Sequence, residues 1–387
     1  MTTLILPAGA GKLAPYTLKM PKAFPAAKPP FSRVAFAAAH VVADPLAEHD
    51  PWLTPAIDWD RTIAFRQHLW SLGFGVAEAM DTAQRGMGLD WTDALDLVRR
   101  SLDAAKDVPG AVVASGAGTD HLAPGPDVTI DKVIAAYEEQ CGAIEKLGGR
   151  IILMASRALT AAAKSPDEYA KVYSRILSQV KQPVILHWLG EMFDPALTGY
   201  WGNADHMAAM NTCLDVINAN AAKVDGIKIS LLDKDKEIVM RRKLPKGVRM
   251  YTGDDFNYAE LIAGDSEGYS DALLGIFDAI APAAAAALGA LTRGDEKTFH
   301  ELLAPTVPLS RHIFRAPTRF YKTGVVFMAY LNGHQDHFVM VGGQQSTRSA
   351  QHLAELFRLA DAAGLLSDPE RAASRMKAVM ATHGIAA

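Results

Sequence analysis

The sequence predicts an α/β protein, a (β/α)8 barrel with a proline-rich N-terminal arm and a C-terminal helical extension. Eight short apolar segments alternate with amphipathic segments, as strands and covering helices do in a parallel sheet. Eight such units in about 250 residues match the usual size of a (β/α)8 barrel. The rival fold is a doubly wound open sheet, but no G-x-G-x-x-G turn follows the first apolar segment. We therefore expect the barrel.

Residues 1–30 are expected to form an extended arm, because prolines repeatedly interrupt helix and central strand there, at Pro15, Pro21, Pro25, Pro29 and Pro30. The barrel is expected over residues 31–290, with strands at 34–39, 75–80, 111–115, 150–155, 183–187, 224–230, 248–252 and 272–276. Helical patterns lie between them, at 60–72, 91–105, 130–147, 166–180 and 204–222. Ser165 precedes Pro166, with Glu168 three residues after the serine, which is typical of a capped helix start.

Residues 291–387 are expected to form helices, because apolar positions such as Leu353, Leu356 and Ala360 recur at intervals of three and four. These helices would pack against the barrel or against another subunit. Together with the arm they offer more surface than one barrel needs, so a homo-oligomer is predicted.

The composition narrows the partners and the location. With 39 basic and 43 acidic residues, the formal charge of -4 provides no positive field for nucleic acid or anionic lipid. Cys141 and Cys213 cannot form a disulfide framework for a chain of this length, and both are interpreted as reduced thiols. No signal peptide and no membrane-spanning apolar run is evident, which favours a cytoplasmic location.

Barrel enzymes build their active sites at the C-terminal ends of the strands, so polar residues there are the candidates. In the strand 224–230 side chains alternate, and Lys228 lies on the face opposite Ile227 and Ile229. If the isoleucines pack against the helices, Lys228 points into the barrel. Burial there lowers the pKa of its amine towards the range in which a neutral amine attacks a carbonyl. Lys228 is therefore a candidate for Schiff-base formation.

The alternative is that Lys228 leans out of the strand end and pairs with Asp254 or Asp255. The neighbouring motifs favour the first interpretation. Val-Asp-Gly-Ile-Lys stands at 224–228, Tyr-Thr-Gly-Asp-Asp at 251–255 and Gln-Pro-Val-Ile-Leu-His at 182–187. These stretches resemble the Schiff-base strand, the following strand end and the fifth strand of the dihydrodipicolinate synthase and N-acetylneuraminate lyase family. The resemblance extends from residue 31 to about residue 310, and it implies a class I aldolase or lyase that needs no cofactor.

The sequence departs from this family at two places. The family's Gly-Thr-Thr-Gly-Glu loop, which holds the carboxylate of a 2-oxo acid, is replaced by Met-Asp-Thr-Ala-Gln at 80–84. Thr82 survives, but Asp81 would repel a carboxylate at close range, so the substrate is expected to lack the 2-oxo acid group. The family also has a tyrosine just beyond its fourth strand as a proton relay, and none stands at 156–159.

His187 ends the fifth strand and is our candidate to move the proton instead, because histidine exchanges protons near neutral pH. The alternative is a buried His187 that only bonds to the backbone. The predicted enzyme is a lyase acting on a small carbonyl compound, with Lys228, His187 and Ser156 as catalytic residues. The expected substrate-binding residues are Asp81, Thr82, Asp120, Arg157, Glu191, Thr252 and Asp254. The carboxylates among them suit a hydroxyl-rich substrate, such as a keto-sugar or a sugar-derived ketone.

Two other functions stay open. A divalent metal could be bound by His40, Glu78, His187 and Glu191 in a barrel hydrolase, lyase or isomerase, although no tight ligand motif supports this. The stretch His334-Gln335-Asp336-His337 looks more like a metal motif, but it is expected to be a solvated surface loop. The third function is a non-catalytic sugar-binding barrel. No metal site and no cofactor are assigned.

Overall fold

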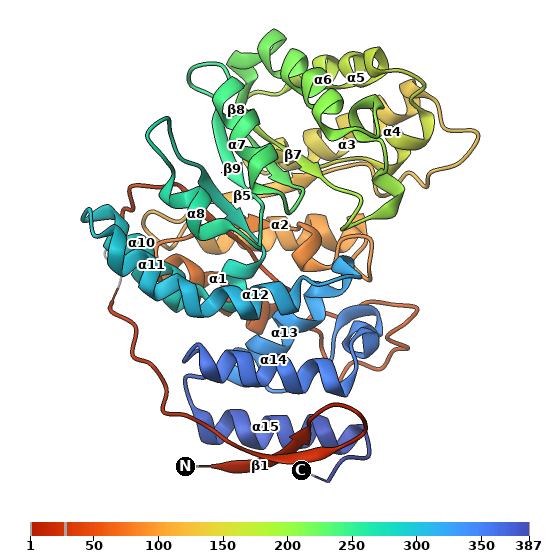
Figure 1. The fold of residues 1–387 in the computed structure, drawn as a ribbon. Coiled ribbons are helices and arrows are strands. Elements are labelled where there is room, and N and C mark those ends of the chain that lie inside the picture. The colour runs from red at the N-terminus through yellow and green to blue at the C-terminus, as the bar shows by residue number, and fades with distance from the viewer. Residues whose placement is uncertain (1, 27–28, 387) are drawn as a thin grey trace.

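The computed structural model describes residues 2–26 and 29–386. Eight parallel strands close into a barrel in the order β10-β3-β4-β5-β6-β7-β8-β9, and helices surround it (Figure 1). The predicted (β/α)8 barrel with a helical C-terminal extension is therefore confirmed. The barrel strands are β3 Ala35–Ala38, β4 Gly75–Glu78, β5 Val113–Ala117, β6 Arg150–Leu153, β7 Val184–Leu189, β8 Val224–Ser230, β9 Arg249–Thr252 and β10 Asp271–Leu274.

Side chains on the two faces of these strands form two separate apolar layers. Phe36, Ile152, Ile185, Tyr251 and Leu273 belong to a small cluster inside the barrel. The alternate residues join the large core between the strands and the covering helices. This division follows from the period of two along a strand, and it decides which polar side chains face the interior.

Each of the eight predicted strands overlaps one strand of the barrel. Two ends differ. β5 begins at Val113 rather than at residue 111, and it continues to Ala117. β7 runs on to Leu189, because Trp188 and Leu189 are buried like the rest of the strand and pair with β8.

The helices around the barrel are α1 Trp59–Ser71, α2 Trp91–Ala105, α3 Ile130–Lys146, α4 Arg157–Ala162, α5 Pro166–Gln179, α6 His206–Ala219, α7 Lys234–Lys243, α8 Tyr258–Ala263 and α9 Ile276–Ala279. Several begin at an Asp or Thr whose side chain accepts a backbone N–H, as Asp58 does for α1 and Thr129 for α3. Ser165 precedes α5 but makes no such bond. The Glu168 carboxylate instead accepts the backbone N–H of Lys164.

α10 Ala281–Thr292 follows α9 and lies almost entirely within the range predicted for the barrel. The C-terminal extension consists of α11 Glu296–Leu303, α12 Val307–Ile313, α13 Tyr321–Asn332, α14 Ala350–Ala362 and α15 Pro369–Thr382. α13 is buried along almost its whole length, because it contacts α9 and the short helix η1 Asp81–Ala83 as well as α14 and α15. The extension thus brings residues beyond 320 against a loop that follows β4. This contact shapes the candidate site.

The N-terminal residues form a hairpin of β1 Thr3–Pro7 and β2 Leu13–Thr17, which lies beside α15 in Figure 1. Pro15 is tolerated because both strands of a two-stranded sheet are edges. The hairpin is held by the Tyr16 hydroxyl, which donates to Asp361 of α14 at 2.6 Å.

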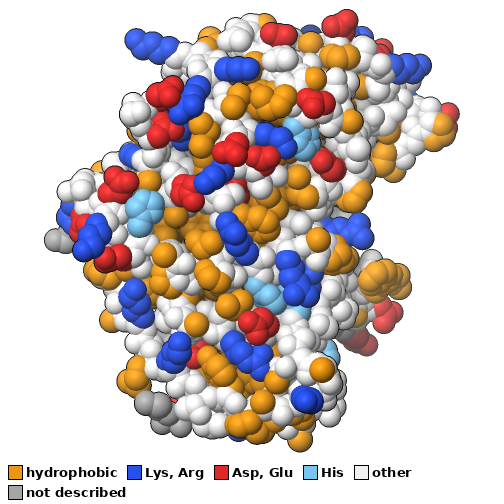
Figure 2. Space-filling model, in the orientation of Figure 1, with side chains coloured by type: hydrophobic (Ala, Val, Ile, Leu, Met, Phe, Trp, Pro, Cys, Tyr) orange, Lys and Arg blue, Asp and Glu red, His pale blue; other side chains and the backbone are white. Residues whose placement is uncertain are grey.

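On the face shown in Figure 2, acidic and basic side chains are interspersed. Among the described residues, no helix is long and apolar enough to cross a membrane. Cys141 and Cys213 are buried, and burial raises the pKa of both thiols.

Candidate active site

Lys228 lies on β8 with its side chain inside the barrel. Ile227 and Ile229 belong to the outer core against the helices, so the residue between them faces the interior. In the sheet register Lys228 is opposite His187 of β7 on one side and Tyr251 of β9 on the other. Gly253 leaves room for it, because a Cβ there would come within 2.8 Å of the Lys228 Cε atom.

The Lys228 amine has no carboxylate partner at ion-pair distance in the part of the chain that the structure describes. Lys228 is 8% exposed, and burial lowers the pKa of its amine, while the carboxylates of Asp255 and Asp81 act in the opposite direction. The alternative pairing with Asp254 or Asp255 is not formed.

Both of these carboxylates have other partners. Asp254 accepts the backbone N–H groups of Phe256 and Asn257, so it shapes the turn after β9. Asp255 accepts the backbone N–H of Ile276 at the start of α9, and burial raises the pKa of Asp255 to about 7. Of the two carboxylates that the sequence offered as partners, Asp255 is the one that acts on the pKa of Lys228.

His187 lines a cavity at the C-terminal mouth of the barrel. Its Nε2 lies 3.2 Å from the Ser230 hydroxyl, whereas its Nδ1 is buried with no hydrogen-bond partner among the described residues. Burial, together with the positive charge of Lys228, lowers the pKa of His187 far below its ordinary value. The expectation that His187 titrates near neutral pH is thus wrong, because an imidazolium would be desolvated beside a lysine. The ring is neutral at pH 7.

Asp81 and Thr82 lie in η1, directly after β4. Asp81 lines the cavity and acts on two lysines, since its carboxylate raises the pKa of Lys228 and of Lys322. The Thr82 hydroxyl lies 2.8 Å from the Tyr321 hydroxyl. Tyr321 and Lys322 are the first two residues of α13, and sequence reasoning missed both. The helical periodicity of the extension gave no sign that α13 would reach the barrel.

The cavity measures about 590 Å³, including the open space at its mouth. Four of the predicted site residues line it, namely Asp81, Asp120, Arg157 and His187. Two of them are already ion-paired, because Asp120 binds Arg85 and Arg157 binds Asp194. Burial alone would raise the pKa of Asp120, but the Arg85 guanidinium and the Gln140 amide hold it below its usual value.

Six of the ten predicted residues lie outside this lining, namely Lys228 and Thr82, described above, and the four that follow. Ser156 caps α4, and its hydroxyl lies 2.6 Å from that of Thr119, which does line the cavity. Glu191 pairs with His206 at 3.0 Å. Thr252 is on the outer face of β9 near Glu237 of α7. The Asp254 carboxylate accepts a hydrogen bond from the Asn257 side chain within the turn after β9. The side chains of these four therefore serve the framework around the site.

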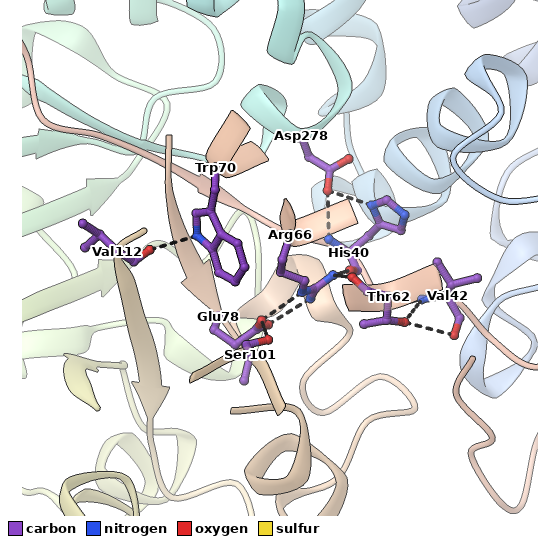
Figure 3. Close-up of polar contacts among 10 residues, drawn as sticks. His40, Val42, Thr62, Arg66, Trp70, Glu78, Ser101, Val112 and Asp278 are labelled. Atoms are coloured by element: carbon purple, nitrogen blue, oxygen red, sulfur yellow. Dashed lines mark hydrogen bonds and ion pairs between the residues drawn. The ribbon is translucent and has the colours of Figure 1, made fainter. Parts of the chain in front are cut away.

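The proposed metal ligands do not converge. Glu78 forms two bonds of 2.9 Å with Arg66, and a third of 2.5 Å with Ser101, as Figure 3 shows. The His40 Nδ1 lies 2.8 Å from Asp278 in the same view. No group of three or more potential ligands able to hold a metal ion is found among residues 2–26 and 29–386.

The stretch 334–337 is a loop, as predicted, but only part of it is solvated. Asp336 is exposed and pairs with Arg61 and Arg375. Gln335 is fully buried, and the His334 ring packs 4.6 Å from the ring of His68 on α1. Burial lowers the pKa of His334 to about 3.

Residues 4–385 match the family model described as "Protein of unknown function (DUF993)". The chain belongs to this family. No curated protein matches it. Among solved structures, dihydrodipicolinate synthase from Aquifex aeolicus is similar at a TM-score of 0.65 and 10% identity, covering 87% of this chain and 100% of that one.

A putative dihydrodipicolinate synthetase from Pseudomonas aeruginosa has a TM-score of 0.63 and 15% identity, and covers 86% of this chain and 99% of its own. A prophage protein of the dihydrodipicolinic acid synthase family from E. coli K12, solved in complex with pyruvate, has a TM-score of 0.64 and 12% identity, with 91% and 99% covered. At these identities the likeness establishes a shared fold. The family resemblance seen in the strand motifs is thus confirmed at the level of the fold.

Proposed function

We propose that this protein is a lyase of the class I aldolase type that forms a Schiff base between Lys228 and a small carbonyl compound. The observation that carries the proposal is the Lys228 amine. It is buried inside the barrel next to His187, a residue that lines the cavity, it has no carboxylate at ion-pair distance among the described residues, and its pKa is lowered. A lysine in this state spends more time as the neutral nucleophile than an exposed lysine does. The dihydrodipicolinate synthase fold of the chain agrees with this chemistry.

In the proposed reaction the neutral amine attacks the carbonyl carbon, and a carbinolamine forms. Protonation of its hydroxyl and loss of water give an iminium. The iminium then withdraws the electron pair of the Cα–Cβ bond while the β-hydroxyl loses its proton, so that the distal fragment leaves as an aldehyde and an enamine remains on Lys228. Water adds after reprotonation of the enamine and releases the carbonyl product and the free lysine.

His187 is the proposed proton acceptor. With Nε2 donating to Ser230, the unpartnered Nδ1 carries a lone pair that can take a proton from a substrate hydroxyl. Because the pKa of His187 is lowered, the imidazolium is short-lived and returns its proton to the enamine in the next step. The hydroxyl pair of Thr82 and Tyr321 stands at the same mouth, where it can bond the carbonyl oxygen or the departing water.

Asp81 is the proposed reason that the substrate is a hydroxylated ketone or aldehyde rather than a simple 2-oxo acid. Two like charges about 4 Å apart at an effective dielectric near 20 repel by roughly 4 kcal/mol. Arg157 does not relieve this repulsion, because its guanidinium is paired with Asp194. A substrate hydroxyl would instead donate a charge-assisted hydrogen bond to Asp81.

The test is borohydride reduction of the protein with a panel of keto-sugars and 2-oxo acids, followed by intact-mass measurement and peptide mapping. We expect a single adduct, mapped to Lys228, that forms with a keto-sugar and only weakly with pyruvate. Lys228→Ala should give none, with its fold checked by circular dichroism.

An adduct that survives Lys228→Ala would refute the assigned lysine. If no compound can be trapped on the wild-type protein, the alternative of a non-catalytic sugar-binding barrel is favoured. In Asp81→Thr, pyruvate trapping should increase, and an unchanged preference would show that this loop does not select the substrate.

A further inference from the structure

A second cavity adjoins the first at the barrel mouth. The two cavities share Asp81, Arg85, Arg157, Leu189 and Asp194 as lining residues, so they lie side by side. The second cavity extends outward to Arg319 and to Tyr321 and Lys322 at the start of α13. His187, the strand neighbour of Lys228, lines the first cavity, so a compound that extends from Lys228 past His187 would point towards the C-terminal extension.

Lys322 is an unusual lining residue, because it is only 4% exposed and has no carboxylate at ion-pair distance in the described chain. Its amine contacts the Met87 sulfur and the Arg319 carbonyl oxygen, each at 3.2 Å. A thioether is a weak acceptor, so the three N–H donors of the ammonium are poorly satisfied. Burial lowers the pKa of Lys322 to about 8.

The other charged residues that line the two cavities do not neutralise the positive charge of Lys322. Arg85 is matched by Asp120, and Arg157 is matched by Asp194. Arg319 is exposed, and it packs its guanidinium over the Phe320 ring rather than against a carboxylate.

Asp81 is the one carboxylate lining the outer cavity that has no ion pair among the described residues. Its negative charge acts on both Lys228 and Lys322, so it does not neutralise Lys322 alone. The outer cavity therefore has an excess of positive charge close to Lys322 and Arg319. A buried ammonium without a counterion is stabilised when an anion supplies one.

We propose that Lys322 and Arg319 form an anion subsite that binds a terminal phosphate or carboxylate of the substrate. The inference rests on the proposed Schiff-base function and specifies its substrate class. Lys322 lines only the outer cavity, whereas His187 beside Lys228 lines only the inner one, so the anionic group must lie several bonds from the carbonyl carbon. The substrate is then a hydroxylated ketone or aldehyde with an anionic group at its far end.

The first experiment measures anion binding alone, without any reaction at Lys228. Inorganic phosphate is titrated calorimetrically into the wild type, Lys322→Met, Arg319→Ala and Lys297→Met. Lys297 is the matched control, because it is exposed on α11 far from any lining residue of either cavity. We expect Lys322→Met to weaken phosphate binding by about tenfold or more, the loss expected for one charge-assisted hydrogen bond, and Lys297→Met to leave it unchanged. Equal binding by the wild type and both cavity variants overturns the proposal.

The second experiment compares trapping by borohydride with matched carbonyl compounds. Fructose has no anionic group, fructose 6-phosphate has a phosphate far from its carbonyl, and 5-ketogluconate has a carboxylate far from its carbonyl. In 2-ketogluconate the carboxylate is next to the carbonyl. Either fructose 6-phosphate or 5-ketogluconate should be trapped on the wild type at a concentration at least about tenfold lower than fructose requires. The compound that is trapped better shows whether the subsite prefers phosphate or carboxylate. In Lys322→Met this advantage should disappear while trapping of fructose persists.

The two experiments separate the two proposals. Phosphate binding that depends on Lys322, with no adduct from any compound, would refute the Schiff-base function and leave the anion subsite standing. If an adduct forms at Lys228 but fructose, fructose 6-phosphate and 5-ketogluconate are trapped equally well, the anion subsite is refuted and the Schiff-base function stands.

Discussion

Replacing the buried Lys322 by methionine should stabilise the protein. The two side chains have similar volume, so Met can fill the same space without a charge. The pKa of Lys322 is about 8 in the folded protein against an ordinary value of 10.5. At 1.36 kcal/mol for each pH unit, this difference corresponds to roughly 3 kcal/mol of folding free energy that the charged lysine costs.

The sign of the pH dependence follows from proton uptake. Between pH 8 and pH 10.5 the unfolded chain binds the Lys322 proton and the folded protein does not, so the free energy of unfolding increases with pH in that window. Below pH 8 both states are protonated, and the full cost is present. The advantage of Lys322→Met should therefore be about 3 kcal/mol at pH 7 and should shrink towards zero at pH 10.5.

Urea denaturation of wild type and Lys322→Met at pH 7 and at pH 10.5, with fluorescence and circular dichroism as probes, measures this difference. A variant less stable than wild type at pH 7 would refute the reasoning, because the bonds to Met87 and Arg319 would then outweigh desolvation. Equal gains at both pH values would show that packing rather than charge is the cause. A confirmed gain would mean that the protein retains a destabilising lysine at its barrel mouth, as functional sites often do.

Three further predictions concern other parts of the molecule. Glu78→Gln should lower the free energy of unfolding by about 3–5 kcal/mol, because it leaves the buried Arg66 without its counterion, and a loss below 1 kcal/mol in urea denaturation would contradict this. The rate of adduct formation at Lys228 should increase with pH and level off before pH 10.5, because burial lowers the pKa of the amine. A rate that still increases above pH 10.5 would contradict the lowered pKa. The protein should be an oligomer, because Leu46, Trp52 and Leu53 in the loop after β3 are 92%, 79% and 76% exposed, and a 41.6 kDa particle in light scattering at micromolar concentration would disprove this.

Periodicity within the sequence was sufficient to predict the barrel and the orientation of Lys228. A strand alternates its faces every residue, so the isoleucines at 227 and 229 determined which way Lys228 points. The eight strands and the major covering helices are likewise local patterns, and a helix cap such as Asp58 bonds only three residues away. These features depend on neighbours in the chain, which the sequence displays directly.

The partners and ionisation of the site depend on residues far apart in the chain. Tyr321 meets Thr82 across 239 residues, and Lys322 reaches the barrel mouth because α13 folds back over it. His187 looked like a residue that titrates near neutral pH, but burial next to Lys228 keeps it neutral. Glu78 and His40 looked like metal ligands until the fold gave them Arg66 and Asp278. Desolvation and long-range pairing set these properties, and both exist only once the tertiary structure has closed around the side chains.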